Sequence, residues 1–150
     1  MAPDAGYSDT PLVRKLGLKP GMRVRLLGAP AGYWNAVGGG PAELGAELLG
    51  SGDGGSAGDG PDGPADFTHL FAADPAALHE ALGRARAGMT EDGVVWASWP
   101  KKASGVPTEV GRSEVMAAGK AHGLVDVKVC AFDETWSALK FVIRLRDRSG

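Results

Sequence analysis

The sequence predicts an α/β domain with a mainly parallel β-sheet that ends in an antiparallel hairpin. Along most of the chain, segments typical of strands alternate with segments typical of helices. This alternation is typical of parallel sheets with helices on both faces. The last two strand segments are separated by only a short turn, so we expect them to run antiparallel. A length of 150 residues suits one domain with a buried core.

The first predicted elements are a helix, a strand and a second, short helix. Thr10 supplies a capping hydroxyl, Pro11 suits the first helical position, and Gly17 can end the helix in a left-handed conformation. The apolar residues 24–27 follow a turn and predict the first strand. Residues 32–37 then predict a short helix with two aromatic side chains.

Glycine is concentrated in one stretch of the chain. The sequence contains 24 glycines, and eleven of them lie between Gly38 and Gly63. Residues 43–49 suit either a helical turn or a weak strand. Residues 50–64 have almost nothing apolar to bury, so we expect a flexible loop there, within the single domain.

A strand, a helix and another strand follow in the middle of the chain. Residues 67–72 predict the second clear strand. Asp74 and Pro75 repeat the cap-and-proline helix start, and Gly88 ends the helix. Residues 94–99 form an apolar run with β-branched and aromatic side chains, which is typical of a strand buried on both faces.

The last part of the chain predicts a helix and a hairpin. The helix lies within residues 109–122 and starts at Thr108 or Ser113. Residues 125–130 alternate valine with other side chains, as a strand does. After a turn, a last strand runs from about residue 136 to 145. These two strands form the predicted antiparallel pair.

Composition excludes several classes of protein. One cysteine excludes an internal disulfide framework. A net charge of −2 gives no electrostatic case for binding nucleic acid. No apolar run approaches the length of a membrane span, and no secretory signal is visible, so we expect a cytoplasmic protein. The oligomeric state does not follow from the sequence.

Two patterns in the glycine-rich stretch match known motifs by their letters alone. Residues 58–63 match G-x-G-x-x-G, and residues 54–58 match the nucleophile pattern G-x-S-x-G. Both motifs need a preceding strand and a following helix, and neither is predicted here. We therefore assign no function to these matches.

The turn after the first strand is the position for nucleotide recognition. Residues 28–32 contain two glycines but no G-x-G, and Pro30 removes an N–H group that could meet an anion. An acid for the ribose hydroxyls is expected roughly 20 residues later. Glu47 and Asp53 lie near that position, but no convincing strand presents either of them. The sequence therefore predicts no bound cofactor.

Histidine and cysteine offer no reactive or metal-binding cluster. His69, His79 and His122 lie on a predicted strand and two predicted helices without the spacing of metal ligands. We therefore expect structural or surface roles for them and no metal site. Cys130 has apolar neighbours on its strand, so we expect a buried thiol and not a nucleophile.

In open α/β sheets, ligands bind outside the carboxyl ends of the strands. The loops predicted at this edge combine aromatic and polar residues, as small-molecule sites do. The candidate ligand-binding residues are Tyr33, Trp34, Trp99, Lys102, Ser104 and Trp136. If the protein is an enzyme, the candidate catalytic residues are Lys101, Asp133 and Glu134. The alternative is that Trp99 ends a buried strand, the lysines lie in a solvated loop, and the acidic pair forms an ordinary hairpin turn.

The order of elements resembles that of the class I S-adenosylmethionine-dependent methyltransferases. Their fold is a Rossmann-like three-layer sandwich in which the last strand inserts antiparallel between its neighbours. The resemblance implies S-adenosylmethionine as a cofactor. The glycine motif and the ribose-binding acid of that fold do not match in this sequence.

Three stretches are similar to the uncharacterised domain-of-unknown-function family numbered 3052. They are residues 7–12 with 16–17, residues 99–105 (W-P-K-K-A-S-G), and residues 123–130 running into 133–137. The main departure is the glycine-rich stretch at 38–64, where the resemblance implies a compact second strand. The resemblance supports the fold and implies no reaction.

These observations favour a small-molecule-binding protein with a degenerate methyltransferase-like fold. One alternative is an enzyme that uses the same pocket, either a cofactor-independent lyase, isomerase or cyclase, or a divergent methyltransferase. The other alternative is an interaction module in which the acidic, glycine-rich loop forms a flexible arm.

Overall fold

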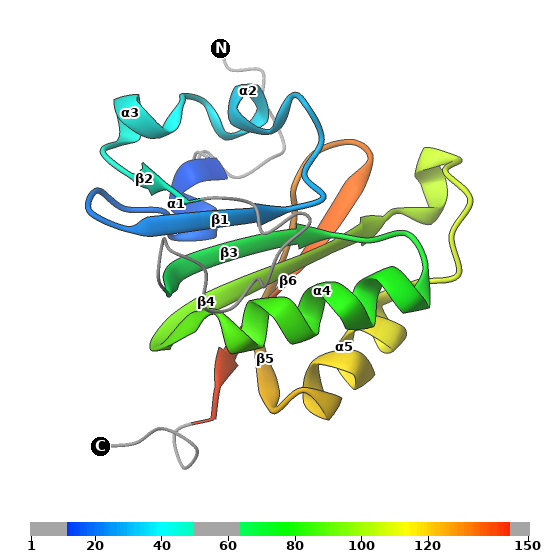
Figure 1. The fold of residues 1–150 in the computed structure, drawn as a ribbon. Helices are drawn as coiled ribbons and strands as arrows, with labels where there is room; N and C mark the ends of the chain where they lie inside the picture. The colour runs from blue at the N-terminus through cyan, green and yellow to red at the C-terminus, as the bar shows by residue number, and fades with distance from the viewer. Residues whose placement is uncertain (1–11, 50–63, 145–150) are drawn as a thin grey trace.

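The computed structural model describes residues 12–49 and 64–144. The helices are α1 (Leu12–Leu16), α2 (Tyr33–Val37), α3 (Pro41–Leu44), α4 (Pro75–Ala87) and α5 (Arg112–Ala121), with a 3₁₀ turn η1 at Lys102–Ser104 (Figure 1). The strands are β1 (Arg23–Leu27), β2 (Glu47–Leu48), β3 (Ala65–Phe71), β4 (Met89–Pro100), β5 (Leu124–Ala131) and β6 (Trp136–Ile143). The predicted α/β alternation with a final hairpin is confirmed.

The six strands form one sheet in the order β2-β1-β3-β4-β6-β5. The first four strands are parallel, and β6 pairs antiparallel with both β4 and β5. Strand β5 therefore points in the same direction as β1, β3 and β4. The order reverses between β1 and β3, which makes this the switch point of the sheet.

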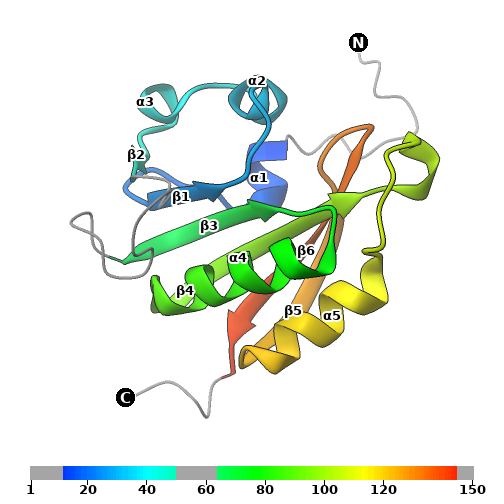
Figure 2. The ribbon, with the colours of Figure 1, turned by 45° about the vertical axis from the view of Figure 1, so that its right-hand side comes forward.

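The core has two halves, one on each face of the sheet. On one face α4 and α5 bury side chains such as Leu78, Leu82 and Val115 (Figure 2). On the other face α1 and α2 bury Leu16 and Tyr33 against the sheet. These two halves make the three layers of the predicted sandwich.

Local capping signals fix the helix ends as predicted. The Asp74 side chain accepts a hydrogen bond of 2.9 Å from the backbone N–H of Ala77, and Pro75 is the first residue of α4. Gly17 follows α1 with a left-handed φ of +80°. The positions of Thr10 and Pro11, which should begin this helix, lie outside the described residues.

Helix α5 starts between the two predicted starts, Thr108 and Ser113, and matches neither. The helix begins at Arg112, and the Gly111 N–H donates to Glu114 Oε1 over 2.9 Å. Thr108 has another role, because its hydroxyl donates to the Ala73 carbonyl over 2.6 Å and accepts from the Val110 N–H. This residue therefore ties the loop before α5 to the end of β3.

Other boundaries also differ from the prediction. Residues 43–49 contain both the end of a helical turn, α3, and a two-residue strand, β2. Strand β4 begins at Met89, five residues before the predicted start, and the last strand ends at Ile143. The predicted loop at 50–64 falls almost entirely outside the described residues.

Within residues 12–49 and 64–144, no helix has the length and apolar character needed to cross a membrane.

Candidate functional site

The carboxyl edge of the sheet gathers the loops that the sequence predicted there. Strands β1, β3, β4 and β5 all end at this edge, because they are parallel. The loop after β4 contacts the β5–β6 hairpin through a hydrogen bond of 2.8 Å from the Lys101 N–H to the Thr135 carbonyl. Figure 1 shows the hairpin, in orange, rising at the end of β4 that leads to η1. The candidate residues after β4 and those of the hairpin are therefore neighbours.

An aromatic cluster fills the α2 side of this edge. The Tyr33 ring stacks on Phe132 with centroids 5.2 Å apart, and His69 stacks on Phe71 at 4.5 Å. Trp136 meets Phe71 edge-on at 5.0 Å, and Trp34 meets Tyr33 edge-on at the same separation. Predicted ligand contacts Tyr33, Trp34 and Trp136 thus belong to one packed group on one face of the sheet.

A buried chain of polar groups runs through this cluster. The Tyr33 hydroxyl lies 3.0 Å from His69 Nδ1, and His69 Nε2 lies 2.8 Å from Ser98 Oγ. A neutral imidazole can donate at one nitrogen and accept at the other, so one ring satisfies both contacts. The chain joins α2, β3 and β4 across the carboxyl half of the sheet.

Burial keeps all members of this chain neutral. Desolvation lowers the pKa of His69 from 6.5 to about 3 and raises the pKa of Tyr33 above its usual value. Serine, histidine and tyrosine here have the connectivity of a nucleophile, its base and an orienting group. All three side chains are buried, so a substrate has no path to Ser98. We therefore interpret the chain as structural.

Trp99 lies on the opposite face of the sheet from the other two candidate tryptophans. It packs in the core half that α4 and α5 cover, whereas Trp34 and Trp136 pack with α2. The register explains the separation, because Trp99 pairs with Ser137 and successive side chains on a strand alternate between faces. The sequence predicted all three tryptophans as ligand contacts at one edge, but Trp99 does not pack in the same group as Trp34 and Trp136.

The polar candidates have distinct local roles. Ser104 Oγ donates to the Lys101 carbonyl over 2.6 Å and closes the turn η1. Asp133 accepts hydrogen bonds of 2.8 Å from the N–H groups of Thr135 and Trp136, so this carboxylate organises the hairpin turn. Glu134 is exposed beside it. For Asp133, the structure favours the turn that was the alternative interpretation.

A cavity of about 370 Å³ opens at the carboxyl end of β4. Trp99 and Pro100 form its strand side, Lys102 lies on η1, and residues 108–112 with Glu114 complete the lining. We call this the β4–α5 cavity. It contains two of the predicted ligand contacts, Trp99 and Lys102, and it adds Arg112, which the sequence interpretation did not select.

A second cavity, of about 270 Å³, lies at the switch point of the sheet. Leu27 and Gly28 at the end of β1, Phe71 at the end of β3, and residues of α4 line it. Two of the α4 residues are Glu80 and Arg84, whose side chains form an ion pair of 3.7 Å. Its wall therefore already contains a charge pair.

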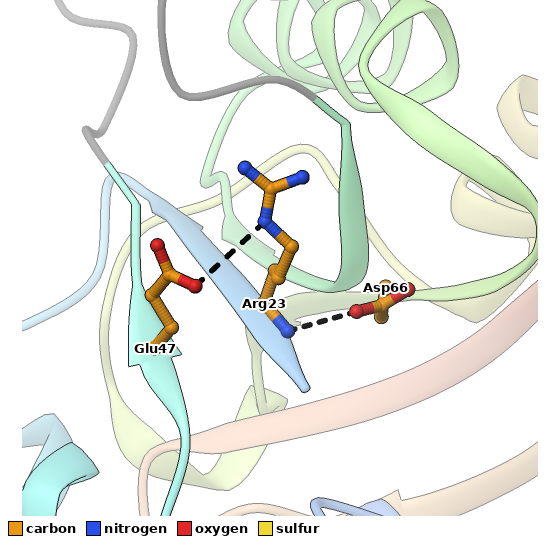
Figure 3. A network of polar contacts seen from close by, with 3 residues as sticks. All are labelled: Arg23, Glu47 and Asp66. Carbon is orange, nitrogen blue, oxygen red and sulfur yellow. Dashed lines mark hydrogen bonds and ion pairs between the residues drawn. The ribbon is translucent and has the colours of Figure 1, made fainter. Parts of the chain in front are cut away.

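The amino edge of the sheet contains Glu47, one of the two acids that lie near the expected ribose-binding position in sequence. Arg23 starts β1, and its Nε lies 3.9 Å from the Glu47 carboxylate at the start of β2 (Figure 3). The Arg23 N–H also donates to Asp66 Oδ2 over 2.9 Å. Glu47 does stand on a strand, but it stands at the edge opposite the ligand-binding loops.

Comparison with known proteins identifies the fold. No family model and no curated protein matches the chain. It is similar to a TehB-like SAM-dependent methyltransferase from Corynebacterium glutamicum, with a TM-score of 0.60 and 12% identity over 94% of this chain and 91% of that one. A SAM-dependent methyltransferase from Aquifex aeolicus gives 0.59 and 19% identity, covering 88% and 87%. Magnesium protoporphyrin IX methyltransferase from Synechocystis, solved with bound SAM, gives 0.62 and 11% identity, covering 89% and 74%.

These likenesses show the fold alone, because the sequences are distant. The chain has the fold of the class I S-adenosylmethionine-dependent methyltransferases, with a mainly parallel sheet and an inserted antiparallel last strand.

Two features expected for the cofactor of this fold, the glycine motif after β1 and an acid after β2, are not found among the described residues. Glu47 lies at the amino edge of the sheet, and the chain after Leu49 lies outside the described residues. The turn after β1 contains Pro30, which has no N–H to donate. Gly28 is held close to β3, since a Cβ there would lie 3.0 Å from the Phe71 carbonyl. Asp53, the other candidate acid, lies outside the described residues.

Sequence reasoning missed two groups of residues at this edge. The contact between His69 and Ser98 was not predicted. Each lies two positions from an aromatic residue of its buried strand, and so on the same face as that residue. Thr108 and Arg112 were not selected for the β4–α5 cavity, because that choice depends on where α5 begins. The alternation along β3 and β4 was the signal available for the first pair, and no local signal marked the second.

Proposed function

We propose that the protein binds a small polar molecule at the carboxyl edge of its sheet, in the β4–α5 cavity. The observation that supports this most is the coincidence of that cavity with the edge where this fold places its ligands. Its volume of about 370 Å³ falls in the range of small-molecule sites.

The lining combines an apolar wall with charges of both signs. Trp99 and Pro100 provide a surface for an apolar or planar part of a ligand. Lys102 and Arg112 are exposed and cationic, and Glu109 is exposed and anionic. Such a lining suits a small molecule with an anionic group, such as a carboxylate or phosphate, next to an apolar part.

Family membership is part of the same proposal. The two most specific stretches that resemble family 3052 form the loop after β4 and the β5–β6 hairpin, and they meet in the hydrogen bond between Lys101 and Thr135. The chain thus keeps its most family-like segments together at the proposed binding edge. We infer that these segments serve one function.

A thermal-shift screen tests the proposal. The full chain is heated with small carboxylates, phosphates and amino acids, and each compound that raises Tm is titrated against a Lys102→Ala/Arg112→Ala variant. We expect the variant to lose the shift, and a Lys128→Ala variant, which removes an exposed lysine outside the cavity, to keep it. The proposal fails if no compound stabilises the wild type, or if the double variant binds equally well.

The structural neighbours favour a second candidate, a divergent methyltransferase. Because the glycine motif after β1 and an acid after β2 are not found among the described residues, we expect calorimetry to detect no binding of S-adenosylmethionine up to millimolar cofactor. Measurable binding at lower concentration would replace the first proposal with this second one. A Lys101→Ala variant changes the same loop outside the β4–α5 cavity, because Lys101 does not line that cavity.

A further inference from the structure

Two histidines meet at the surface where α4 packs against α5. His79 Nδ1 lies 3.3 Å from His122 Nε2, although the two residues are 43 positions apart in sequence. The rings are 5.5 Å apart between centroids and tilted by 44°. His79 is exposed and His122 is half-exposed, so solvent and ions reach both nitrogens.

The separation of the two nitrogens matches one coordination geometry. Zinc binds imidazole nitrogen at roughly 2.0–2.1 Å with tetrahedral angles, which places two nitrogen ligands about 3.3–3.4 Å apart. Cis ligands at right angles, as in octahedral or square-planar sites, would lie only about 2.8–3.0 Å apart at the same bond length. We propose that His79 and His122 form a two-imidazole site for Zn²⁺ that clips α4 to α5.

Each ring, in its neutral form, can offer a lone pair to the metal. In the metal-free protein, one ring donates its N–H to the other across the 3.3 Å contact. On metal binding, that proton moves to the far nitrogen of its own ring, so both rings stay neutral and each presents a lone pair.

Beside the two histidines, the described residues offer no third protein ligand for the zinc ion. No group of three or more His, Cys, Asp or Glu side chains is arranged to hold a metal within residues 12–49 and 64–144. Two water molecules, or donors from a bound molecule, would therefore complete the tetrahedron. Such a site is exchangeable and differs from a four-ligand structural site. Gly83, one turn after His79, lies beside the His122 ring, and a Cβ there would be in ordinary contact, 3.5 Å from His122 Cε1.

Calorimetric titration of the untagged full chain with ZnCl₂, after dialysis against EDTA, tests the site. We expect one zinc per chain and a higher Tm in zinc than in EDTA. His79→Ala and His122→Asn should each weaken zinc binding at least about tenfold, which is ~1.4 kcal/mol. Glu80→Gln, which changes the residue next to His79, is the control and should leave zinc binding unchanged. Co²⁺ in place of Zn²⁺ should give the intense visible absorption of tetrahedral cobalt.

Three results would overturn the assignment. The first is the absence of zinc binding at millimolar metal. The second is binding that survives loss of both histidines, as it would if Cys130 or another group were the ligand. The third is the weak absorption of octahedral Co²⁺. Urea unfolding of both histidine variants shows whether a loss of binding reflects a loss of folding.

Discussion

Acidification from neutral pH should destabilise this protein through His69. The buried ring holds its proton only below about pH 3, whereas an unfolded histidine takes up a proton near pH 6.5. Between these two values, the unfolded state binds one more proton than the folded state. Stability is therefore complete above pH 6.5 and falls as the pH decreases toward 3.

The magnitude follows from that difference in bound protons. Each pH unit within the window costs about 1.4 kcal/mol, so lowering the pH from 7.5 to 5 should remove about 2 kcal/mol. Urea unfolding followed by tryptophan fluorescence, at several pH values between 7.5 and 5, measures this slope. Working above pH 5 keeps most carboxylates ionised.

A matched pair of variants isolates the residue. His69→Gln removes the titrating ring, so its free energy of unfolding should be lower at pH 7.5 but should change less as the pH falls. His122→Gln should retain most of the slope, because His122 is only partly buried. Equal slopes in the wild type and His69→Gln would refute the reasoning, as would a wild-type stability that does not change over this range.

Three further substitutions test the packing. Gly119→Ala should destabilise the protein by about 1–3 kcal/mol, although alanine has the better helix propensity, because the new Cβ would lie 2.5 Å from Phe141 Cζ. Thermal unfolding measures this loss, and a rise in Tm would contradict the prediction. Asp74→Ala should lower the free energy of unfolding by about 1 kcal/mol, because α4 loses its cap. Asp74→Asn, whose side chain can still cap the helix, should retain most of the wild-type stability in the same assay. Trp96→Phe should cost about 1–3 kcal/mol, because the buried carbonyl of Leu16 loses its 2.8 Å bond to the indole; an unchanged urea midpoint would show that this carbonyl finds another donor.

Local signals made much of the fold predictable. The cap at Asp74 and the left-handed Gly17 depend on neighbouring residues, and both lie where the sequence placed them. The start of β4 was not predictable in this way. Residues 89–93 include polar side chains, and they belong to the strand because Met89 pairs with Ala65 beyond an irregularity in the register. That pairing is a tertiary contact without a local signature.

The candidate site was predictable as an edge but not as a set of contacting side chains. Parallel strands with known carboxyl ends suffice to name the loops. Which face Trp99 occupies relative to Trp136 depends on the register between β4 and β6, and a shift of one residue would reverse it. The contact between His79 and His122 depends on how α4 packs against α5, so their spacing in sequence gives no indication of it.

The position of β6 affects how this protein folds during synthesis. The last described strand, β6, lies inside the sheet, between β4 and β5, and every described strand contact of β5 is with β6. While residues 136–143 are still in the ribosome, β5 can be made but has no strand to join, and β4 presents an open edge. Exposed edges of this kind can pair with other chains. The nascent chain therefore depends on its final strand to convert two open edges into one continuous sheet.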